Sequence, residues 1–336
     1  MIQLIEINNL KNIEEESFEF APLTIITGLN STGKSTLIQS ALIFSKINSE
    51  NGNLVLKDIC SDFDIIRDRS LKEKPVKVSI KIDDVDYEYI IGKNKIINET
   101  NKKDNPLMIE ENLFYLSANR IGFDENEKND NKFISGIDGE YIPATFEREK
   151  YNSLESSMIK HNDTLNTLSA QVNYWLTYIF SIKFELMTES TDDKIIIKYK
   201  SDNIDDLRPM QLGSGIIYLT KILILSLRSK KNDILIFENP EIYLHPAAQS
   251  RLGEFFTFIV NNGIQVIIET HCEHLLNRIQ YEIFKKRFSF KNAIILYKGG
   301  LKDKFKTIKF DEEGHFKDEF PEGFFDATLD CLLEME

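Results

Sequence analysis

One segment of the chain leaves few options for its fold, 23-LTIITGLNSTGKSTLIQSALIF-44. An apolar strand leads into the pattern G-x-x-x-x-G-K-S, and a helix with regularly spaced apolar residues follows it. Strand, glycine-containing loop and helix in this order form a phosphate-binding loop, because the loop N–H groups meet an anion at the positive end of the helix. The segment therefore predicts an α/β protein that binds a nucleotide.

The residue types in this loop suit contact with a triphosphate. Glycine at positions 28 and 33 lets the backbone approach phosphate without a Cβ clash. We expect Lys34 to neutralise β- and γ-phosphate oxygens and Ser35 to ligate Mg²⁺. The predicted phosphate-binding residues are Gly28, Asn30, Ser31, Thr32, Gly33, Lys34, Ser35 and Thr36.

Length and composition fit a soluble globular protein with one elaborate domain or two lobes. The chain has 336 residues, and no apolar run reaches the roughly 18 residues that a membrane helix needs. The N-terminal residues read as a strand and not as a signal peptide. Cys60, Cys272 and Cys331 lie too far apart to suggest a metal site or a disulfide framework. We therefore expect a cytoplasmic protein without a membrane anchor.

Charge is distributed unevenly along the chain. The net charge of −13 opposes non-specific binding of DNA by the whole surface. Residues 281–310 nevertheless contain nine Lys or Arg and two acids, whereas residues 311–336 contain ten acids and one Lys. This pattern fits either a solvated surface beside a solvated tail or a partner site that includes Lys285, Lys286 and Arg287.

Hydrophobic periodicity divides the chain into two kinds of structure. The first part predicts strands, an antiparallel meander and one helix, at 2–7, 15–20, 23–27, 34–48 (helix), 76–84, 86–99 and 113–117. Residues 124–150 are polar and predict a mobile surface insertion. The later part alternates strands with helices, which predicts a mainly parallel sheet. Helices are expected at 154–181, 247–262, 272–286 and 323–335, and a Gly-rich turn that runs into an apolar helix is expected at 207–227. Strands are expected at 182–188, 193–199, 233–237, 264–269, 292–298 and 304–310.

Three further motifs follow the loop in a fixed order. A Gly/Ser turn opens a helix at 211-QLGSG-215, a strand ends at Glu238 in 234-ILIFENPEIYLHP-246, and a later strand ends in 269-ETH-271. With these motifs the chain resembles the SMC/RecF/OLD-type branch of ABC ATPases, and within it a group of compact bacterial and archaeal ATPases. The words 115-YLSANRIG-122 and 320-FPEGFFD-326 extend this resemblance over nearly the whole chain.

The resemblance implies a single ABC-type ATPase head over residues 1–336. In such a head, helices flank a mixed, largely parallel sheet, and an antiparallel β lobe and a helical insertion are added. The implied parts are lobe I at 1–123, the insertion and helical lobe at 124–206, and the remaining α/β part at 207–336. The insertion is too short for a long SMC coiled-coil arm, and too few residues follow His271 for the nuclease domain of OLD proteins.

The same resemblance implies roles for individual residues, with ATP and Mg²⁺ as cofactors. Glu238 would be the Walker B acid that holds Mg²⁺ together with Ser35, and His271 would be the switch histidine at the γ-phosphate. Signature-turn residues would cap the γ-phosphate bound by a second copy, namely Gly213, Ser214 and Gly215 after Leu212. Residues 244–246 would form the D-loop at the dimer contact. Ser117 to Arg120 would form a Q-loop-like connection, although a structural Arg120 is an equal alternative.

The implied function is that of an ATP-driven switch. ATP would join two copies head to tail into a homodimer or higher oligomer, and hydrolysis would release them. A separately encoded effector such as a nuclease or toxin would act downstream, in anti-phage defence or genome maintenance. The alternatives are a non-hydrolysing ATP-dependent scaffold or sensor, and a repair ATPase that binds DNA directly.

The residue that activates water stays open at this level. Asn239 follows Glu238, and an amide cannot accept a proton at neutral pH. Glu241 is one candidate base, since it lies two residues further on. Alternatively, Asn239 positions water with help from His271, or the protein hardly hydrolyses ATP. Positioning alone is physically reasonable, because phosphoryl transfer depends mainly on orientation and charge stabilisation.

Overall fold

The computed structural model describes residues 1–47, 74–91, 96–98, 106–118, 122–130, 133–160, 165–202, 204–320 and 324. Contacts divide the chain into two compact units. The first unit consists of Met1–Ile109, Glu269–Glu273 and Gln280–Glu336, and the second consists of Glu110–Ile268 and His274–Ile279. The lobe boundaries expected from the sequence stay predictions.

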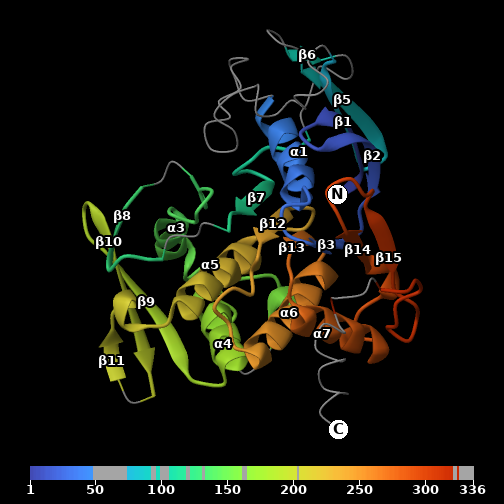
Figure 1. The fold of residues 1–336 in the computed structure, drawn as a ribbon. Coiled ribbons are helices and arrows are strands. Elements are labelled where there is room, and N and C mark those ends of the chain that lie inside the picture. The colour runs from blue at the N-terminus through green and yellow to red at the C-terminus, as the bar shows by residue number, and fades with distance from the viewer. Residues whose placement is uncertain are drawn as a thin grey trace. The chain divides into compact units, whose positions relative to one another are not determined.

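The first unit contains an antiparallel sheet with the strand order β2-β1-β4-β5-β6 (Figure 1). Its strands are β1 Ile2–Leu10, β2 Ile13–Glu19, β4 Val76–Ile82, β5 Val85–Ile91 and β6 Ile96–Asn98. Alternate residues of β4 are buried, as expected for a strand with one face on the core. Asp83 and Asp84 both have left-handed backbones, which matches a tight hairpin turn. The predicted meander is thus confirmed here. The sequence also predicts a turn of this meander at Gly92–Lys93, and these two residues lie outside the described part of the chain.

The phosphate-binding loop of this unit follows a fully buried strand, β3 Leu23–Gly28. β14 Ala293–Lys298 pairs with β3 in parallel, and β15 Lys306–Lys309 pairs with β14 in antiparallel orientation. Helix α1 Lys34–Ile47 begins directly after the loop and packs on β1, β3 and β4 (Figure 1). Burial of β3 on both faces explains why its sequence is a continuous apolar run without alternation.

The second unit places helices beside short parallel strands. β12 Ile234–Glu238 pairs in parallel with β7 Leu113–Leu116, and β13 Gln265–Glu269 is its other neighbour. Its helices are α4 Leu168–Phe180, α5 Ser214–Arg228 and α6 Pro246–Asn261, and α7 Glu273–Phe284 is shared between the units. α4 packs against α5 and α6, where the buried Trp175 meets Phe255 edge to face at a centroid distance of 4.8 Å. No described helix is long and apolar enough to cross a membrane.

A second antiparallel sheet completes this unit. It has the order β11-β10-β8, with β9 also paired to β10. Its strands are β8 Asn126–Lys128, β9 Phe184–Ser190, β10 Lys194–Ser201 and β11 Ile204–Leu207. Short 3-10 turns occur at Ser156–Met158, Pro209–Gln211 and Phe290–Asn292. Parallel strands, flanking helices and antiparallel sheets together confirm the predicted mixed α/β class.

Residues 124–150 are not the surface insertion that their polarity predicts. They contain β8 and a helix, α3 Ile142–Glu149, whose first five residues are buried. The Glu110 carboxylate explains much of this, because it accepts hydrogen bonds from the N–H groups of Ile134, Ser135 and Gly136 at 2.7 to 2.9 Å. Backbone N–H groups of this segment therefore bind a carboxylate of the protein instead of water.

The predicted helix at 154–181 is also wrong in its first half. α4 begins only at Leu168, and the Thr167 hydroxyl caps it by accepting a hydrogen bond from Ala170 N at 3.3 Å. Before it, the chain turns back on itself, so that Leu154 N donates to Asn166 O and Leu168 N donates to Asn152 O. Such pairing is not periodic along the sequence, and hydrophobic spacing cannot reveal it.

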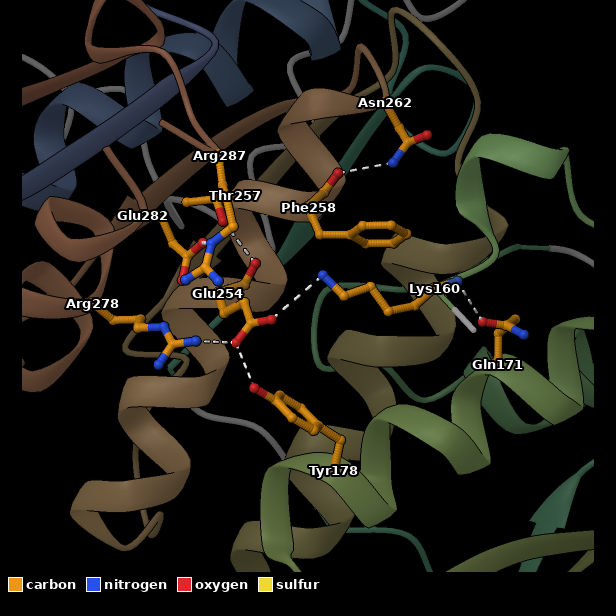
Figure 2. Close-up of polar contacts among 10 residues, drawn as sticks. All are labelled: Lys160, Gln171, Tyr178, Glu254, Thr257, Phe258, Asn262, Arg278, Glu282 and Arg287. Atoms are coloured by element: carbon orange, nitrogen blue, oxygen red, sulfur yellow. Dashed lines mark hydrogen bonds and ion pairs between the residues drawn. The ribbon is translucent and has the colours of Figure 1, made fainter. Parts of the chain in front are cut away.

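Glu254 on α6 joins three separate elements of the second unit through its carboxylate (Figure 2). The Tyr178 hydroxyl on α4 donates to it at 2.6 Å, the Arg278 guanidinium on α7 donates to it as well, and Lys160 Nζ lies 3.4 Å away. Desolvation acts to raise the pKa of Glu254, but the Tyr178 hydrogen bond and the two cations together lower it. Desolvation and the hydrogen bond to Glu254 raise the pKa of Tyr178 to about 12. The ionised Glu254 side chain thus connects α6 to α4 and α7.

Candidate nucleotide-binding site

The phosphate-binding loop begins where the chain passes very close to β14. Gly28 has a φ of +130°, and a Cβ at this position would lie 2.1 Å from the backbone oxygen of Lys298. Leu29 N also donates to that oxygen, at 3.0 Å. Only glycine fits this approach, so the glycine at 28 has a packing reason as well as a phosphate-binding one.

Asn12 holds the loop from the turn between β1 and β2. Its side-chain amide donates to Thr32 O at 2.6 Å, and its side-chain oxygen accepts from the Thr36 hydroxyl at 3.3 Å. Gly33, with a φ of +104°, lets the loop pass this side chain, because a Cβ there would lie 2.3 Å from it. Sequence analysis missed Asn12, since a polar residue in a hairpin turn carries no local sign of such a role.

Lys34 turns back over the loop that precedes it. Its ammonium donates to the carbonyl oxygens of Gly28 and Leu29, at 3.1 and 2.7 Å, and the residue is 3 % exposed. Burial lowers the pKa of Lys34, and the charge of Glu269 acts in the opposite direction. Two backbone oxygen atoms of the loop therefore hold the Lys34 ammonium. Phosphate oxygens of a bound nucleotide can take the place of these oxygen atoms as acceptors. Left-handed backbones at Ser31 and Gly33 fit the same purpose, because such turns form anion-binding nests.

Glu269 reaches the first turn of α1 from the end of β13. The Ser35 hydroxyl donates to its two carboxylate oxygens at 3.0 and 3.3 Å, and Glu269 is 7 % exposed. Thr270 N donates to Ile26 O on β3 at 3.0 Å, which fixes the backbone beside this carboxylate. The predicted site included His271 from the same motif but not Glu269. Glu269 could have been found from its position, because it ends a predicted strand two residues before His271.

His271 lies beside the same loop. Desolvation lowers the pKa of its imidazole, and the positive charge of Lys34 lowers it further. The imidazole is therefore neutral at neutral pH and can donate one hydrogen bond to an anion. The first unit thus gathers a cation, a hydroxyl, a carboxylate and a neutral imidazole around the N-terminus of α1, and this set of groups fits a nucleotide phosphate with a divalent cation.

The predicted Walker B residue lies in the second unit. Glu238 is the last residue of β12, and its carboxylate accepts a hydrogen bond from Ala118 N at 3.1 Å. Ser117 is fixed in turn, because its N–H donates to Ile137 O at 2.9 Å. The structure therefore links Glu238 to the beginning of the predicted Q-loop-like segment. Arg120 in that segment lies outside the described residues.

Asn239 has a left-handed backbone with a φ of +44°. Asparagine tolerates this conformation better than most residues, so the turn itself favours an amide after the strand-end acid. The turn continues with hydrogen bonds from Ile242 N to Asn239 O at 3.2 Å and from Leu244 N to Glu241 O at 3.0 Å. Glu241 is buried within it. Its role as a base stays a prediction.

The signature turn packs against the D-loop within the second unit. Gly213 and Ser214 are exposed at the beginning of α5, whereas Gly215 is buried, and a Cβ on it would lie 2.6 Å from Tyr243 O. The rings of Tyr218 and Tyr243 stack next to this contact at a centroid distance of 5.6 Å. Two of the three predicted signature residues are thus free to meet a ligand or a second copy.

His245 has a local structural function. It is the N-cap of α6, and its Nδ1 accepts a hydrogen bond from Ala247 N at 3.3 Å. Pro246 follows as the first helical residue, a position that proline favours. This side chain therefore helps to begin the helix after the D-loop.

The basic segment at 281–310 is partly neutralised by neighbours in the first unit. Arg287 forms two hydrogen bonds with the carboxylate of Glu282, at 2.7 and 2.8 Å. Lys286 Nζ donates to the backbone oxygen of Glu312, and Lys309 Nζ lies 2.9 Å from a Glu19 oxygen. These contacts reduce the charge available to a polyanion, and binding of DNA here stays a prediction.

Comparison with known proteins decides the family. A family model described as "AAA domain, putative AbiEii toxin, Type IV TA system" matches residues 23–277. The chain belongs to this AAA-domain family. The match runs from the strand before the phosphate-binding loop to the helix after His271, so it includes every predicted nucleotide-site residue.

Relatives of this AAA-domain protein agree with the resemblance to SMC and OLD proteins. The chain is 31 % identical over 161 residues to the Old nuclease of Escherichia phage P2, and this match covers 46 % of the chain and 27 % of the nuclease. The chain thus spans about a quarter of that curated relative. An SMC head bound to the C-winged helix domain of ScpA is similar over 93 % of this chain and 98 % of its own, with a TM-score of 0.59 and 14 % identity.

A second SMC structure gives the same result for the fold. The SMC head domain with an extended coiled coil, bound to the C-terminal domain of ScpA derived from Pyrococcus furiosus, covers 99 % of both chains. Its TM-score is 0.58 and its identity is 12 %. The AAA-domain protein therefore has the fold of an SMC head domain.

Proposed function

We propose that this AAA-domain protein binds ATP with Mg²⁺, hydrolyses it slowly, and uses the cycle to dimerise head to tail and to control a separately encoded partner. The observation that carries the proposal is the loop at 28–36, which Asn12 and β14 hold in shape while Ser35, Glu269 and His271 surround the head of α1. These groups match the charge and the hydrogen-bonding capacity of a nucleotide phosphate with a cation.

The metal would be held by residues that the sequence already indicates. Ser35 would provide the hydroxyl ligand, and Glu238 would supply a carboxylate from β12. Bound Mg²⁺ supplies charge that stabilises the developing negative charge on phosphate oxygens. Lys34 binds the same oxygens after releasing the loop carbonyls, and the neutral His271 donates a hydrogen bond to the terminal phosphate. Burial of Lys34 strengthens its contact with phosphate, because few water molecules compete for the ammonium.

The dimer part of the proposal rests on the exposure of the signature turn. Gly213 and Ser214 lie at the N-terminus of a 15-residue helix, where N–H groups and a hydroxyl favour an anion. A second copy would present its bound γ-phosphate to this end, so each nucleotide would hold two subunits together. Tyr243 supports this reading, since the residue is 67 % exposed beside the turn.

The relatives support the proposed kind of partner and the proposed biological setting. The solved SMC heads are bound to domains of ScpA, which supports a partner protein for a head of this fold. The family description names a toxin and a toxin–antitoxin system, and the curated relative is a phage nuclease. We therefore place the protein in anti-phage defence or genome maintenance, with a nuclease or toxin as a separate effector.

The test is phosphate release and molecular mass with the full chain. Wild type is expected to turn over ATP slowly and repeatedly. Glu238→Gln should lower turnover by at least about 100-fold, because it weakens a metal contact worth several kcal/mol, and should accumulate as a dimer with ATP. Wild type that binds ATP without turnover would support the scaffold alternative instead. A monomer at every ATP concentration would overturn the dimer proposal.

The same assay separates the candidates for the water-activating group. Glu241→Gln lowers single-turnover hydrolysis if Glu241 is the base, whereas Asn239→Ala lowers it if the amide positions water. Unchanged hydrolysis in Glu241→Gln would remove the first mechanism. Glu185→Gln is a suitable control, since Glu185 on β9 pairs with the exposed Lys183 and has no proposed part in nucleotide binding.

A further inference from the structure

We propose that Glu269 is the carboxylate that orients the Ser35 hydroxyl toward the nucleotide-bound metal ion, so that this AAA-domain protein has a second strand-end acid on the metal side in addition to Glu238. The inference rests on the proposed function, because it concerns the metal ion that accompanies ATP. It assigns Glu269 as a positioning residue that acts through Ser35.

The first argument is the bonding capacity of a hydroxyl. Serine has one proton to donate and two lone pairs to offer. When a lone pair binds a cation, the proton remains and still needs an acceptor. The two Glu269 oxygens accept that proton from Ser35 Oγ at 3.0 and 3.3 Å. With its proton committed to Glu269, the oxygen keeps its lone pairs for the metal.

The second argument is the setting of the carboxylate. Glu269 is 7 % exposed, and an ionised group at such a position needs partners. Ser35 is one such partner, and the Lys34 ammonium in the same loop interacts with Glu269 electrostatically. A bound divalent cation would add positive charge near this carboxylate and would stabilise its ionised form. Partners of this kind commonly change metal affinity by about 10- to 100-fold.

The third argument is rigidity. Thr270 N donates to Ile26 O at 3.0 Å, and Cys272 N donates to the Thr270 hydroxyl at 3.0 Å. Glu269 therefore enters the site from a backbone that is tied to β3. The Glu238 carboxylate accepts a hydrogen bond from the N–H of Ala118 in its own unit, at 3.1 Å. The two acids can therefore be substituted and tested one at a time.

The test measures how much Mg²⁺ tightens binding of a fluorescent ADP analogue by the full chain. Affinity is measured in excess Mg²⁺ and again in EDTA, and the ratio of the two is the gain from the metal. We expect Glu269→Gln to reduce this gain by about tenfold or more, with the affinity in EDTA unchanged or higher because a negative charge near the phosphates is lost. Retained binding in EDTA also shows that the variant is folded.

Three further variants make the result specific. Glu273→Gln, an acid four positions along on the same segment, should keep the full gain from Mg²⁺. Glu269→Asp keeps the negative charge, but its shorter side chain places the carboxylate further from Ser35, so an intermediate gain from Mg²⁺ is expected. If Glu269→Gln does not fold, the gain measured for Glu269→Asp tests the inference. In a Ser35→Ala background, Glu269→Gln should cause no further loss, because Glu269 acts through the hydroxyl.

Two outcomes would overturn the inference. One is a gain from Mg²⁺ in Glu269→Gln that equals the wild-type gain. The other is an additive loss in the double variant, which would mean that Glu269 acts on the metal independently of Ser35. Failure of the proposed function looks different, since wild type itself would then bind no nucleotide in either condition.

Discussion

Replacing Gly28 with alanine is expected to abolish nucleotide binding and to lower the apparent Tm by roughly 5–10 °C, which corresponds to a loss of about 3 kcal/mol or more. The added Cβ would lie 2.1 Å from the backbone oxygen of Lys298, and a backbone atom in a paired strand cannot move aside cheaply. The φ of +130° adds strain for any residue with a Cβ. To avoid the clash in Gly28→Ala, either β3 and β14 must separate, which lowers stability, or the loop must change shape, which disrupts the phosphate site.

The matched control is alanine at Gly213. No atom lies within 4 Å of a Cβ at that position, and its φ is −65°. We expect at most about 1 kcal/mol of destabilisation, from the weaker N-cap. The measurements are thermal unfolding followed by circular dichroism and equilibrium binding of fluorescent ADP. Equal Tm values for the two variants would contradict the close approach between Gly28 and Lys298.

Replacing Glu254 with alanine is expected to destabilise the second unit by about 3 kcal/mol, since it removes the carboxylate that pairs with both Arg278 and Lys160. The environment is only partly buried, which keeps the figure at the lower end of the range for buried pairs. Glu254→Gln should cost less, because it still accepts the Tyr178 hydrogen bond. Urea unfolding measures the loss. Glu185→Ala, in an exposed ion pair, should cost roughly 0.5 kcal/mol or less.

The Glu254 network also has a defined pH dependence. Its pKa is lowered in the folded protein relative to the ordinary value of 4.5. The carboxylate therefore contributes stability in full above that value and loses it as the pH falls through the lower, folded pKa. The difference in stability between wild type and Glu254→Gln should be constant from about pH 5.5 to 8 and should shrink below about pH 4.5. A difference that is unchanged at pH 3.5 would show that the charge of Glu254 is not the stabilising feature.

The sequence was sufficient wherever the signal was local. Lys34 and Ser35 belong to a contiguous motif between a strand and a helix, and α1 begins at Lys34 as expected. β12 and β13 are short apolar runs, and both end at the acids that the motifs indicate, Glu238 and Glu269. In these cases the hydrogen-bonding partners and the apolar neighbours lie within a few residues along the chain.

Prediction failed where a residue's partner lies far along the chain. Asn12 reads as an ordinary turn residue, and only the folded chain shows that it holds Thr32 and Thr36. The 134–136 segment reads as solvated until the Glu110 carboxylate is placed against it. Asn239 shows a different limit, since a missing acid in a motif can reflect a left-handed backbone instead of lost chemistry.

The contact between Gly28 and Lys298 has a consequence for how the protein is made. A ribosome releases the phosphate-binding loop long before β14, the strand that shapes the first residue of the loop. Glu269, the partner of Ser35, also follows it by 234 positions. Chains fold during translation from the N-terminus, and distant contacts form last. A nascent or truncated chain that lacks β14 therefore has no finished nucleotide site, and occupancy by nucleotide reports that β14 has been made and paired with β3.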